Sequence, residues 1–249
     1  MRIVSKPRVT LLAVQQFEKP EHIEWETDAP TGGEALVEFA GRTCYQSYDN
    51  PGRKTNREYL EHLLEVGHGS VLEHWVATLL FEDVSRSLTH ELVRHRAGFA
   101  YSQLSQRYVD ESQARFVEPA CIREDAEAHE IWLRAVEQSQ EAYVRLVELL
   151  REKFREVEDR TMRRKLARQA ARSVLPNATE TKIVVTANAR AWRHFIEMRA
   201  AEEAEVEIRG LAIETLKQLR ERAPNIFGDY VIRALADGTE IAESGHRKV

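Results

Sequence analysis

The sequence predicts an α+β protein that is rich in helix. Segments with apolar residues at helical spacing make up most of the chain, whereas strand-forming segments are few and do not alternate regularly with helices. Its 249 residues, of which 43% are hydrophobic, suffice for one large domain or for two small ones that share a core. The chain has no repeat, low-complexity tract or obvious linker, so residues 1–249 are predicted to form a single domain.

The individual elements follow from the spacing of the apolar residues. Helices are expected where apolar residues recur every three or four positions, at residues 33–42, 55–67, 85–93, 124–157, 162–174, 189–201, 205–222 and 226–236. Strands are expected where short β-favouring runs occur, at residues 9–14, 75–81 and 181–187. The segment from about residue 238 is a polar tail and is expected to fray.

Capping residues mark several helix ends. Thr55 and Glu58 match a capping box, and Gly67 is a typical helix stop. Residues 70–73 repeat the capping-box pattern, and Ser85 is a candidate N-cap.

Composition excludes several classes of protein. The formal net charge is -5 and the pI is near 6.0, which argues against a general nucleic-acid coat. No apolar run is long enough to span a bilayer, and the first residues lack the apolar segment of a secretory signal. Cys44 and Cys121 do not suggest a disulfide framework. A soluble, cytoplasmic protein is therefore expected.

A local concentration of positive charge stands out in this acidic chain. Arg94, His95 and Arg96 are consecutive, hydroxyl and amide side chains follow, and Arg107 closes the run. Such side chains make forked hydrogen bonds to phosphates and to the polar edge of a base. The stretch therefore indicates a specific anionic ligand.

The histidines do not match a metal site. His90 and His95 lie five positions apart, which displaces one from the other by about 140° around a helix, and two arginines flank His95. His68 differs from a typical surface histidine because it lies between two glycines beside a predicted helix start.

Neither cysteine is favoured as a nucleophile. Arg42 lies near Cys44 and would lower its pKa, but an inert thiol is the commoner case, and no base lies near Cys121 in the sequence. The chain also lacks both glycine-rich phosphate motifs, so a nucleotide cofactor would be held in some other way.

The last third offers further cations. Arg172 precedes residues 173–176, and Asn188-Ala189-Arg190 lies at a predicted strand-to-helix junction, where phosphates bind well. Isolated helix arginines such as Arg193 are usually solvated or ion-paired.

Taken together, these segments resemble the flavin-dependent thymidylate synthases. The motifs that carry the resemblance occur in the family's order and are Gly67-His68-Gly69-Ser70-Val71-Leu72-Glu73-His74, Arg94-His95-Arg96, Ser105-Gln106-Arg107, Arg172-Ser173-Val174-Leu175-Pro176, Asn188-Ala189-Arg190 and Arg199-Ala200. The spacer from Ala97 to Leu104 is one residue longer than is usual in the family, and Gly98 would accommodate the extra residue as a bulge.

The resemblance implies a fold with a central, mostly antiparallel sheet and a defined activity. Methylenetetrahydrofolate and FAD reduced by NADPH would convert dUMP to dTMP without a cysteine nucleophile and without a metal. The resemblance also implies a homotetramer with active sites shared between subunits, and no nucleic-acid or membrane partner.

The matched positions supply the predicted site residues. Arg199 takes the catalytic role, at the N3–O2 edge of uracil. The dUMP positions are Glu91, Leu92, Val93, Arg94, Gln103, Leu104, Ser105, Gln106, Arg107, Arg172 and Arg199. The FAD positions are Ser70, Arg94, His95, Arg96, Gln103, Asn188, Ala189, Arg190 and His194. The folate or nicotinamide positions are His68 and Tyr108.

Two other functions stay open at this point. A nucleic-acid-binding module would use the same basic stretch on phosphates, although the acidic net charge counts against it. A different flavin or nucleotide enzyme, such as one that modifies uracil in RNA, would use the same scaffold.

Overall fold

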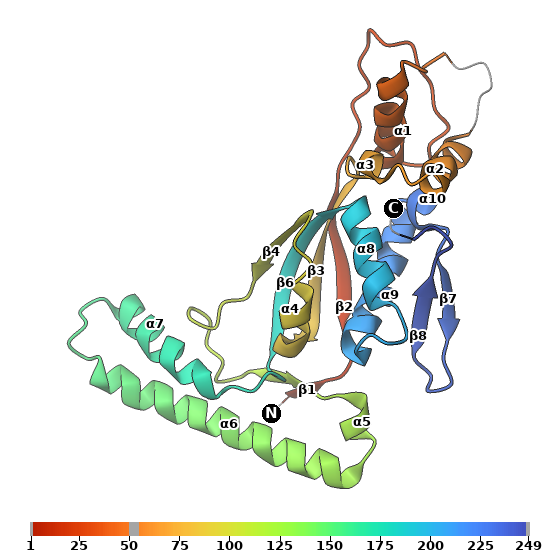
Figure 1. The fold of residues 1–249 in the computed structure, drawn as a ribbon. Helices are drawn as coiled ribbons and strands as arrows, with labels where there is room; N and C mark the ends of the chain where they lie inside the picture. Colours follow the sequence, from red (N-terminus) through yellow and green to blue (C-terminus); the bar gives the residue numbers. More distant parts are fainter. Residues whose placement is uncertain (1, 50–54, 248–249) are drawn as a thin grey trace. The chain divides into compact units, whose positions relative to one another are not determined.

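The structure is a computed structural model that describes residues 2–49 and 55–247. Helices and strands are mixed along the chain (Figure 1), which confirms the predicted α+β class. The chain divides into two compact units. Unit 1 comprises Met1–Lys6, Glu82–Glu91 and Ser102–Ile183, and unit 2 comprises Pro7–Phe81, Leu92–Tyr101 and Val184–Val249.

Unit 1 is built around a pair of helices. The long helix α6 (Ala126–Lys153) lies alongside α7 (Arg160–Ala171), as Figure 1 shows, and Asp125 and Asp159 cap the two helices. Tyr143, Val147 and Ala171 form the core between them. The short strands β1 (Arg2–Val4) and β5 (Arg115–Val117) pair in parallel, and Phe116 of β5 packs with Val136 of α6. The remaining short elements are α5 (Ala120–Arg123) and the 3-10 helix η1 (Arg172–Val174).

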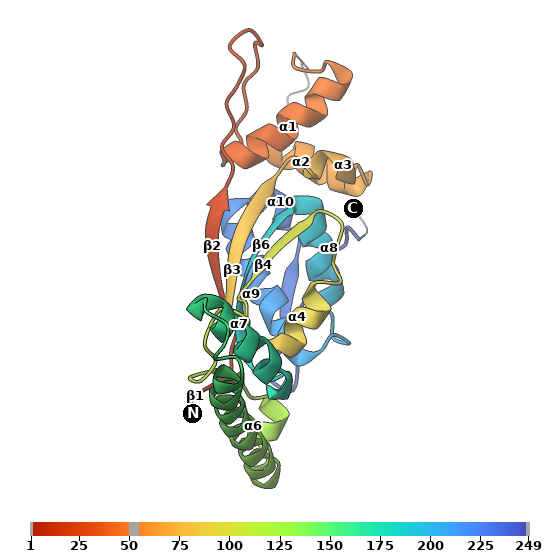
Figure 2. The ribbon, with the colours of Figure 1, turned by 90° about the vertical axis from the view of Figure 1, so that its left-hand side faces the viewer.

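Unit 2 contains most of the other helices. Its first part holds β2 (Arg8–Val14), α1 (Gly32–Tyr45), α2 (Asn56–Glu65) and α3 (Gly69–Leu72). Its last part holds α8 (Ala189–Arg199), α9 (Val206–Arg222), α10 (Pro224–Phe227), β7 (Val231–Ala234) and β8 (Glu240–Glu243). Helices α8 and α9 pack together, and α9 contacts β2 (Figure 2).

A four-stranded sheet has the order β2-β3-β6-β4. Strands β3 (Val76–Ser85), β4 (Phe99–Gln103) and β6 (Glu180–Asn188) each have residues in both units. Buried and partly buried residues alternate along β3 and β6, as expected of strands with one covered face. Helix α4 (Arg86–Leu92) follows β3 directly, and α8 follows β6 directly, so the ends of these strands position the residues that begin both helices.

Two of the predicted N-terminal caps are confirmed and one is wrong. Thr55 and Glu58 form the expected capping box, and Oγ of Ser85 accepts the backbone N–H of Leu88 at 2.9 Å. Ser70 does not begin a helix, because it lies inside α3, whose N-cap is His68 and has no side-chain cap.

The predicted helix over residues 226–236 is wrong, and so is the frayed tail. Helix α10 ends at Phe227, and β7 and β8 form an antiparallel hairpin in which Ile232 pairs with Ala242. The β-branched residues of β7 favour a strand, and Gly238 supplies the positive φ of 78° that the turn requires. Ile241 and Ala242 are 2% and 3% exposed, so the hairpin has a buried face.

The predicted helix over residues 124–157 is shorter in the structure. Asp125 caps the first turn of α6 through the N–H groups of Glu127 and Ala128, and the helix ends at Lys153. Among the helices of residues 2–49 and 55–247, none has the length and apolar composition of a membrane span.

Candidate active site

The candidate site in unit 2 includes a direct contact between His95 and Arg199. Arg199 is the last residue of α8, and its Nε–H donates to Nε2 of His95 at 3.0 Å. An arginine side chain can only donate, so Nε2 of His95 accepts and the ring proton is on Nδ1. Burial, with the charges of Arg199 and His194, lowers the pKa of His95 to about 4. The imidazole is therefore neutral at physiological pH.

Aromatic side chains fix the orientation of the His95 ring. The rings of Phe195, His194 and Phe99 lie 5.3, 5.8 and 6.0 Å from it, measured between ring centroids. The hydroxyl of Tyr101 donates to the carbonyl of His95 at 2.5 Å, and burial raises the pKa of that hydroxyl. Tyr101 therefore stays protonated and holds the backbone at His95. The structure thus brings together three of the predicted residues, namely His95, His194 and Arg199.

The start of α8 forms a second part of the site in unit 2. Strand β6 ends at Asn188 and α8 begins at Ala189, which confirms the predicted strand-to-helix junction. The side chain of Asn188 accepts the N–H of Ala191 at 2.9 Å. Gly98, with a φ of 76°, approaches this turn so closely that a Cβ there would lie 2.9 Å from Cβ of Ala191. The residues that follow Arg96 therefore lie against a helix N-terminus, which attracts anions.

Helix α3 adds its residues beside the same turn. Arg190 forms an ion pair with Glu73, the C-cap of α3, with an N–O distance of 2.8 Å. Both side chains are 46% exposed, so the pair contributes little to stability. The contact nevertheless brings Arg190 close to α3, which carries Ser70 and begins after His68. Both of those predicted residues are exposed.

The other predicted residues of unit 2 differ in exposure. Arg94 and Arg96 are exposed cations, and Val93 is also exposed. Leu92 and Ala189 are fully buried. Their side chains belong to the core, so only their backbone groups are available to a ligand.

Unit 1 holds the residues from Gln103 to Arg107 in a tightly bonded segment. The side-chain amide of Gln103 donates to Oγ1 of Thr89 at 3.0 Å. Leu104 donates its N–H to the carbonyl of Lys182 at 2.9 Å, and its own carbonyl accepts from Arg86 at 2.8 Å. Oγ of Ser105 accepts the N–H of Arg107 at 3.3 Å. Glu91, the remaining predicted residue of α4 in this unit, is partly buried.

Several polar groups of unit 1 are buried without a protein partner. Among the described residues, Nε2 of Gln106 and Nε of Arg107 have no hydrogen-bond acceptor. Unpaired buried donors of this kind are costly unless a ligand or water satisfies them. Arg172 is exposed at the end of α7. These donors could bind an anion.

A small cavity lies beside Tyr108 in the same unit. Its volume is about 90 Å³, and it is lined by Arg107, Tyr108, Thr161, Arg164, Lys165 and Arg168. Nζ of Lys165 lies 5.1 Å from the centre of the Tyr108 ring, and Arg168 donates to the carbonyl of Tyr108 at 2.6 Å. A hydrogen bond and the charge of Lys165 lower the pKa of Tyr108. Tyr108 is 56% exposed, so it is accessible to a planar ligand.

Two further features of the described residues concern metal ligands and free thiols. No group of three or more His, Cys, Asp or Glu side chains among them could hold a metal ion. Cys44 and Cys121 are both exposed free thiols.

Comparison with known proteins identifies the family. Residues 27–225 match the family model described as thymidylate synthase complementing protein. A flavin-dependent thymidylate synthase from Mycobacteroides abscessus is 57% identical over 239 residues, which cover 95% of each chain. The enzyme of that name from Mycolicibacterium vanbaalenii is 53% identical over 246 residues, which cover 98% of each chain. The one from Mycobacterium tuberculosis is 54% identical over 239 residues, which cover 95% of each chain. The chain belongs to the flavin-dependent thymidylate synthase family.

Membership in the flavin-dependent thymidylate synthases confirms the resemblance found in the sequence. All of the predicted site residues, from His68 to Arg199, lie within the matched residues 27–225. Asp229 and the hairpin of β7 and β8 lie beyond them.

Several residues of this flavin-dependent thymidylate synthase that contact predicted residues were missed in the sequence, and three of them are cations. Arg86 bonds to Leu104, and Lys165 and Arg168 flank Tyr108. One signal for the last two was available, because α7 carries Arg160, Arg163, Arg164, Lys165 and Arg168 and has no carboxylate. Arg86 gave no comparable signal, since it is an isolated cation after Ser85.

Proposed function

We propose that this methyltransferase catalyses the reductive methylation of dUMP to dTMP. Methylenetetrahydrofolate supplies the carbon, and NADPH supplies the reducing equivalents through FAD. Membership in the flavin-dependent thymidylate synthase family carries the proposal. The reaction uses no cysteine nucleophile. In the sequence no base lies near Cys121, and an inert thiol is the commoner case for Cys44, which supports that part.

Arg199 is the residue that we assign to the uracil ring. Hydride addition at C6 of uracil places negative charge on the pyrimidine, and a fixed cation at the N3–O2 edge stabilises that charge. The guanidinium keeps its proton at any working pH. Because His95 accepts from Nε, it orients the guanidinium, and we assign the Nη groups to the uracil edge. Because His95 is neutral, its ring brings no second positive charge next to Arg199.

The other dUMP contacts are assigned to the tightly bonded segment of unit 1, to Glu91 and Arg172 of the same unit, and to residues 92–94 of unit 2. The predicted set is Glu91, Leu92, Val93, Arg94, Gln103, Leu104, Ser105, Gln106, Arg107 and Arg172, with Leu92 acting through its backbone. The unpaired Nε of Arg107 and the exposed guanidinium of Arg172 supply the charge that a nucleotide phosphate requires.

The residues of unit 2 fit a flavin dinucleotide. The donor set combines exposed cations, the capped N-terminus of α8 and a glycine that allows close approach at that turn. Together these features suit a pyrophosphate group. The residues assigned to FAD are Ser70, Arg94, His95, Arg96, Asn188, Ala189, Arg190 and His194 of unit 2, together with Gln103 of unit 1. When bound, FAD supplies hydride transfer.

His68 and Tyr108 are assigned to folate or nicotinamide. Tyr108 offers an exposed aromatic face, and the neighbouring Lys165 adds a positive charge for an anionic cosubstrate. We further propose a cytoplasmic homotetramer with shared active sites and with no nucleic-acid or membrane partner. The net charge of -5 agrees with the lack of a nucleic-acid partner.

The test is an anaerobic assay with FAD, dUMP, methylenetetrahydrofolate and NADPH, in which the nucleotide product is identified. We expect dTMP to form only when all four are present. A Cys44→Ser/Cys121→Ser variant should form dTMP at the wild-type rate. A protein that binds FAD but forms no dTMP, or that instead methylates uracil in RNA, would overturn the proposal.

A further inference from the structure

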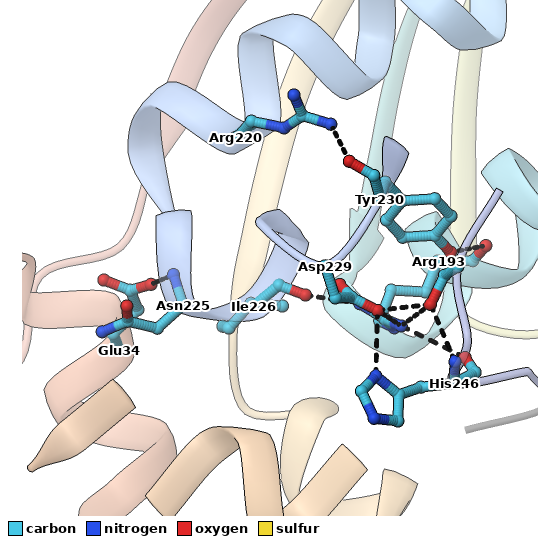
Figure 3. A network of polar contacts seen from close by, with 9 residues as sticks. Glu34, Arg193, Arg220, Asn225, Ile226, Asp229, Tyr230 and His246 are labelled. Atoms are coloured by element: carbon cyan, nitrogen blue, oxygen red, sulfur yellow. Dashed lines mark hydrogen bonds and ion pairs between the residues drawn. The ribbon is translucent and has the colours of Figure 1, made fainter. Parts of the chain in front are cut away.

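A buried network joins α8 to the residues that follow β8. Arg193 of α8 donates to both carboxylate oxygens of Asp229 at 2.7 Å, and it is only 2% exposed. The hydroxyl of Ser244 donates to Oδ2 of Asp229, and Nδ1 of His246 lies 3.3 Å from the same oxygen. Figure 3 shows Arg193, Asp229 and His246 converging at this point. The network therefore ties three separate segments of unit 2 together.

Further bonds make this a well-defined arrangement. Arg193 also donates to the carbonyls of Ile226 and His246, at 2.5 and 3.2 Å. Tyr230 returns a hydrogen bond from its hydroxyl to the carbonyl of Arg193 at 3.1 Å. Burial raises the pKa of Asp229, but the hydrogen bonds of Arg193 and Ser244 outweigh it and leave that pKa lowered. The carboxylate is thus the charged centre of the network.

The same segments meet the end of α8 that carries Arg199. The N–H of Ala242 in β8 donates to the carbonyl of Ala200, the C-cap of α8, at 2.9 Å. A cavity of about 450 Å³ lies here, and its lining includes Arg199, Tyr230, Ser244 and His246. The hairpin and the residues after it therefore form a wall of the cavity in which Arg199 lies.

We propose that Asp229, Ser244 and His246 are positioning residues for Arg199. They act through Arg193 and, together with the separate bond from Ala242 to Ala200, hold the end of α8 in one orientation against the wall of the cavity. Asp229, Ser244 and His246 lie beyond residues 27–225, the part that the family model matches. This inference rests on the proposed function, because it concerns how Arg199 is held for its substrate.

The test uses a Ser244→Ala/His246→Ala variant of the FAD-loaded enzyme. We expect kcat for dTMP formation to fall between about tenfold and a hundredfold, since small displacements of a reacting group have effects of this size. Bound FAD should be unchanged. A single Ser244→Thr variant keeps the hydroxyl and leaves His246 unchanged, so it should retain most of the wild-type rate. Arg233→Ala, which removes an exposed ion pair of the same hairpin to Glu243, is the matched control and should keep full activity.

A double-mutant cycle separates positioning from a loss of stability. In an Arg199→Ala background, the Ser244→Ala/His246→Ala change should cause no further loss of kcat, because the group that it positions is already absent. The inference is overturned if the losses multiply, or if Ser244→Ala/His246→Ala has wild-type kcat. A wild-type enzyme that forms no dTMP would instead refute the proposed function.

If the double variant does not fold, Asp229→Asn takes its place in the same cycle. It keeps the shape and hydrogen-bonding oxygen of Asp229 but removes the charge that pairs with Arg193. The inference is then overturned if its loss of kcat multiplies with that of Arg199→Ala, or if Asp229→Asn has wild-type kcat.

Discussion

Nε of Arg199 lies 3.0 Å from Nε2 of His95 and donates its hydrogen to it, and this bond requires a neutral imidazole. The two residues are 104 positions apart in the sequence, and β4, β6 and the longest segment of unit 1, Ser102–Ile183, lie between them in the chain. A histidine in this role acts as an acceptor that aims the guanidinium. It does not act as an acid or a base.

Substitutions of His95 should therefore differ in their effect on kcat according to whether the new side chain can accept a hydrogen bond from Arg199. His95→Leu should lower kcat for dTMP formation by about tenfold or more, because Arg199 loses the group that orients it. His95→Gln retains an acceptor and should recover part of that loss. The measurement is the steady-state rate at saturating dUMP and FAD. Equal rates for the two variants would show that the acceptor has no role.

The pKa of His95 predicts a pH dependence of stability. It is about 4 in the folded protein, below the ordinary value of 6.5, so the unfolded chain binds more protons between these values. The free energy of unfolding should therefore fall as the pH drops from 6.5 to 4, by up to about 3 kcal/mol. Urea titrations of the wild type and of His95→Gln check this. If both proteins had the same slope in that interval, His95 would not be the titrating group.

Gly98 and Gly67 offer a comparison of two glycines with positive φ. Gly98→Ala would place a Cβ 3.0 Å from Nδ2 of Asn188 in addition to the backbone strain, whereas nothing lies within 4 Å of such an atom at Gly67. Gly67→Ala should cost about 1–2 kcal/mol from the strain alone. Gly98→Ala should cost more and should also weaken FAD binding. Thermal unfolding and a flavin titration measure both effects. Equal losses of stability with normal FAD affinity would contradict the close approach of Gly98 to α8.

The buried carboxyl group of Glu34 should make stability depend on pH in the opposite direction to His95. Its side chain is fully buried on α1 and accepts the N–H of Asn225 at 2.6 Å (Figure 3). Burial raises the pKa of Glu34 above the ordinary value of 4.5, so the folded protein binds the proton more tightly than the unfolded chain. Stability should fall as the pH rises from 4.5 through the folded pKa.

Glu34→Gln is the variant that tests this relation. It keeps the acceptor for Asn225 without the charge, so it should be more stable than the wild type at pH 8 and should lose the dependence. Denaturation at pH 5 and pH 8 provides the comparison. A wild-type advantage at pH 8 would mean that the buried charge is stabilising.

Local signals in the sequence predicted much of the fold. The cap residues Thr55 and Ser85 act within one turn of their helices, so their roles could be deduced from neighbouring residues. The hairpin of β7 and β8 was missed because the apolar residues after Ile226 also fit a helix, and only pairing with residues 240–243 decides between the two. Strands β1 and β5 have three residues each, too few for a periodic pattern.

The site was predictable as a set of motifs but not as a set of contacts. The junction at Asn188 followed from the order of a strand and a helix. The bond from Arg199 to His95 joins distant segments, and no local pattern contains it. Arg193 was expected to be an ordinary solvated or ion-paired helix arginine. It is ion-paired but buried, because Asp229 approaches it from a segment 36 residues away.

The most direct test of the account is dTMP formation by FAD-loaded wild type and Arg199→Ala under anaerobic conditions. Flavin absorbance measures the bound cofactor in the same samples. We predict that the wild type forms dTMP and that Arg199→Ala loses about a hundredfold or more in kcat, as loss of a charge-stabilising donor does elsewhere, with its FAD retained. An Arg199→Ala enzyme with the wild-type rate would contradict the central role of Arg199 and its bond to His95.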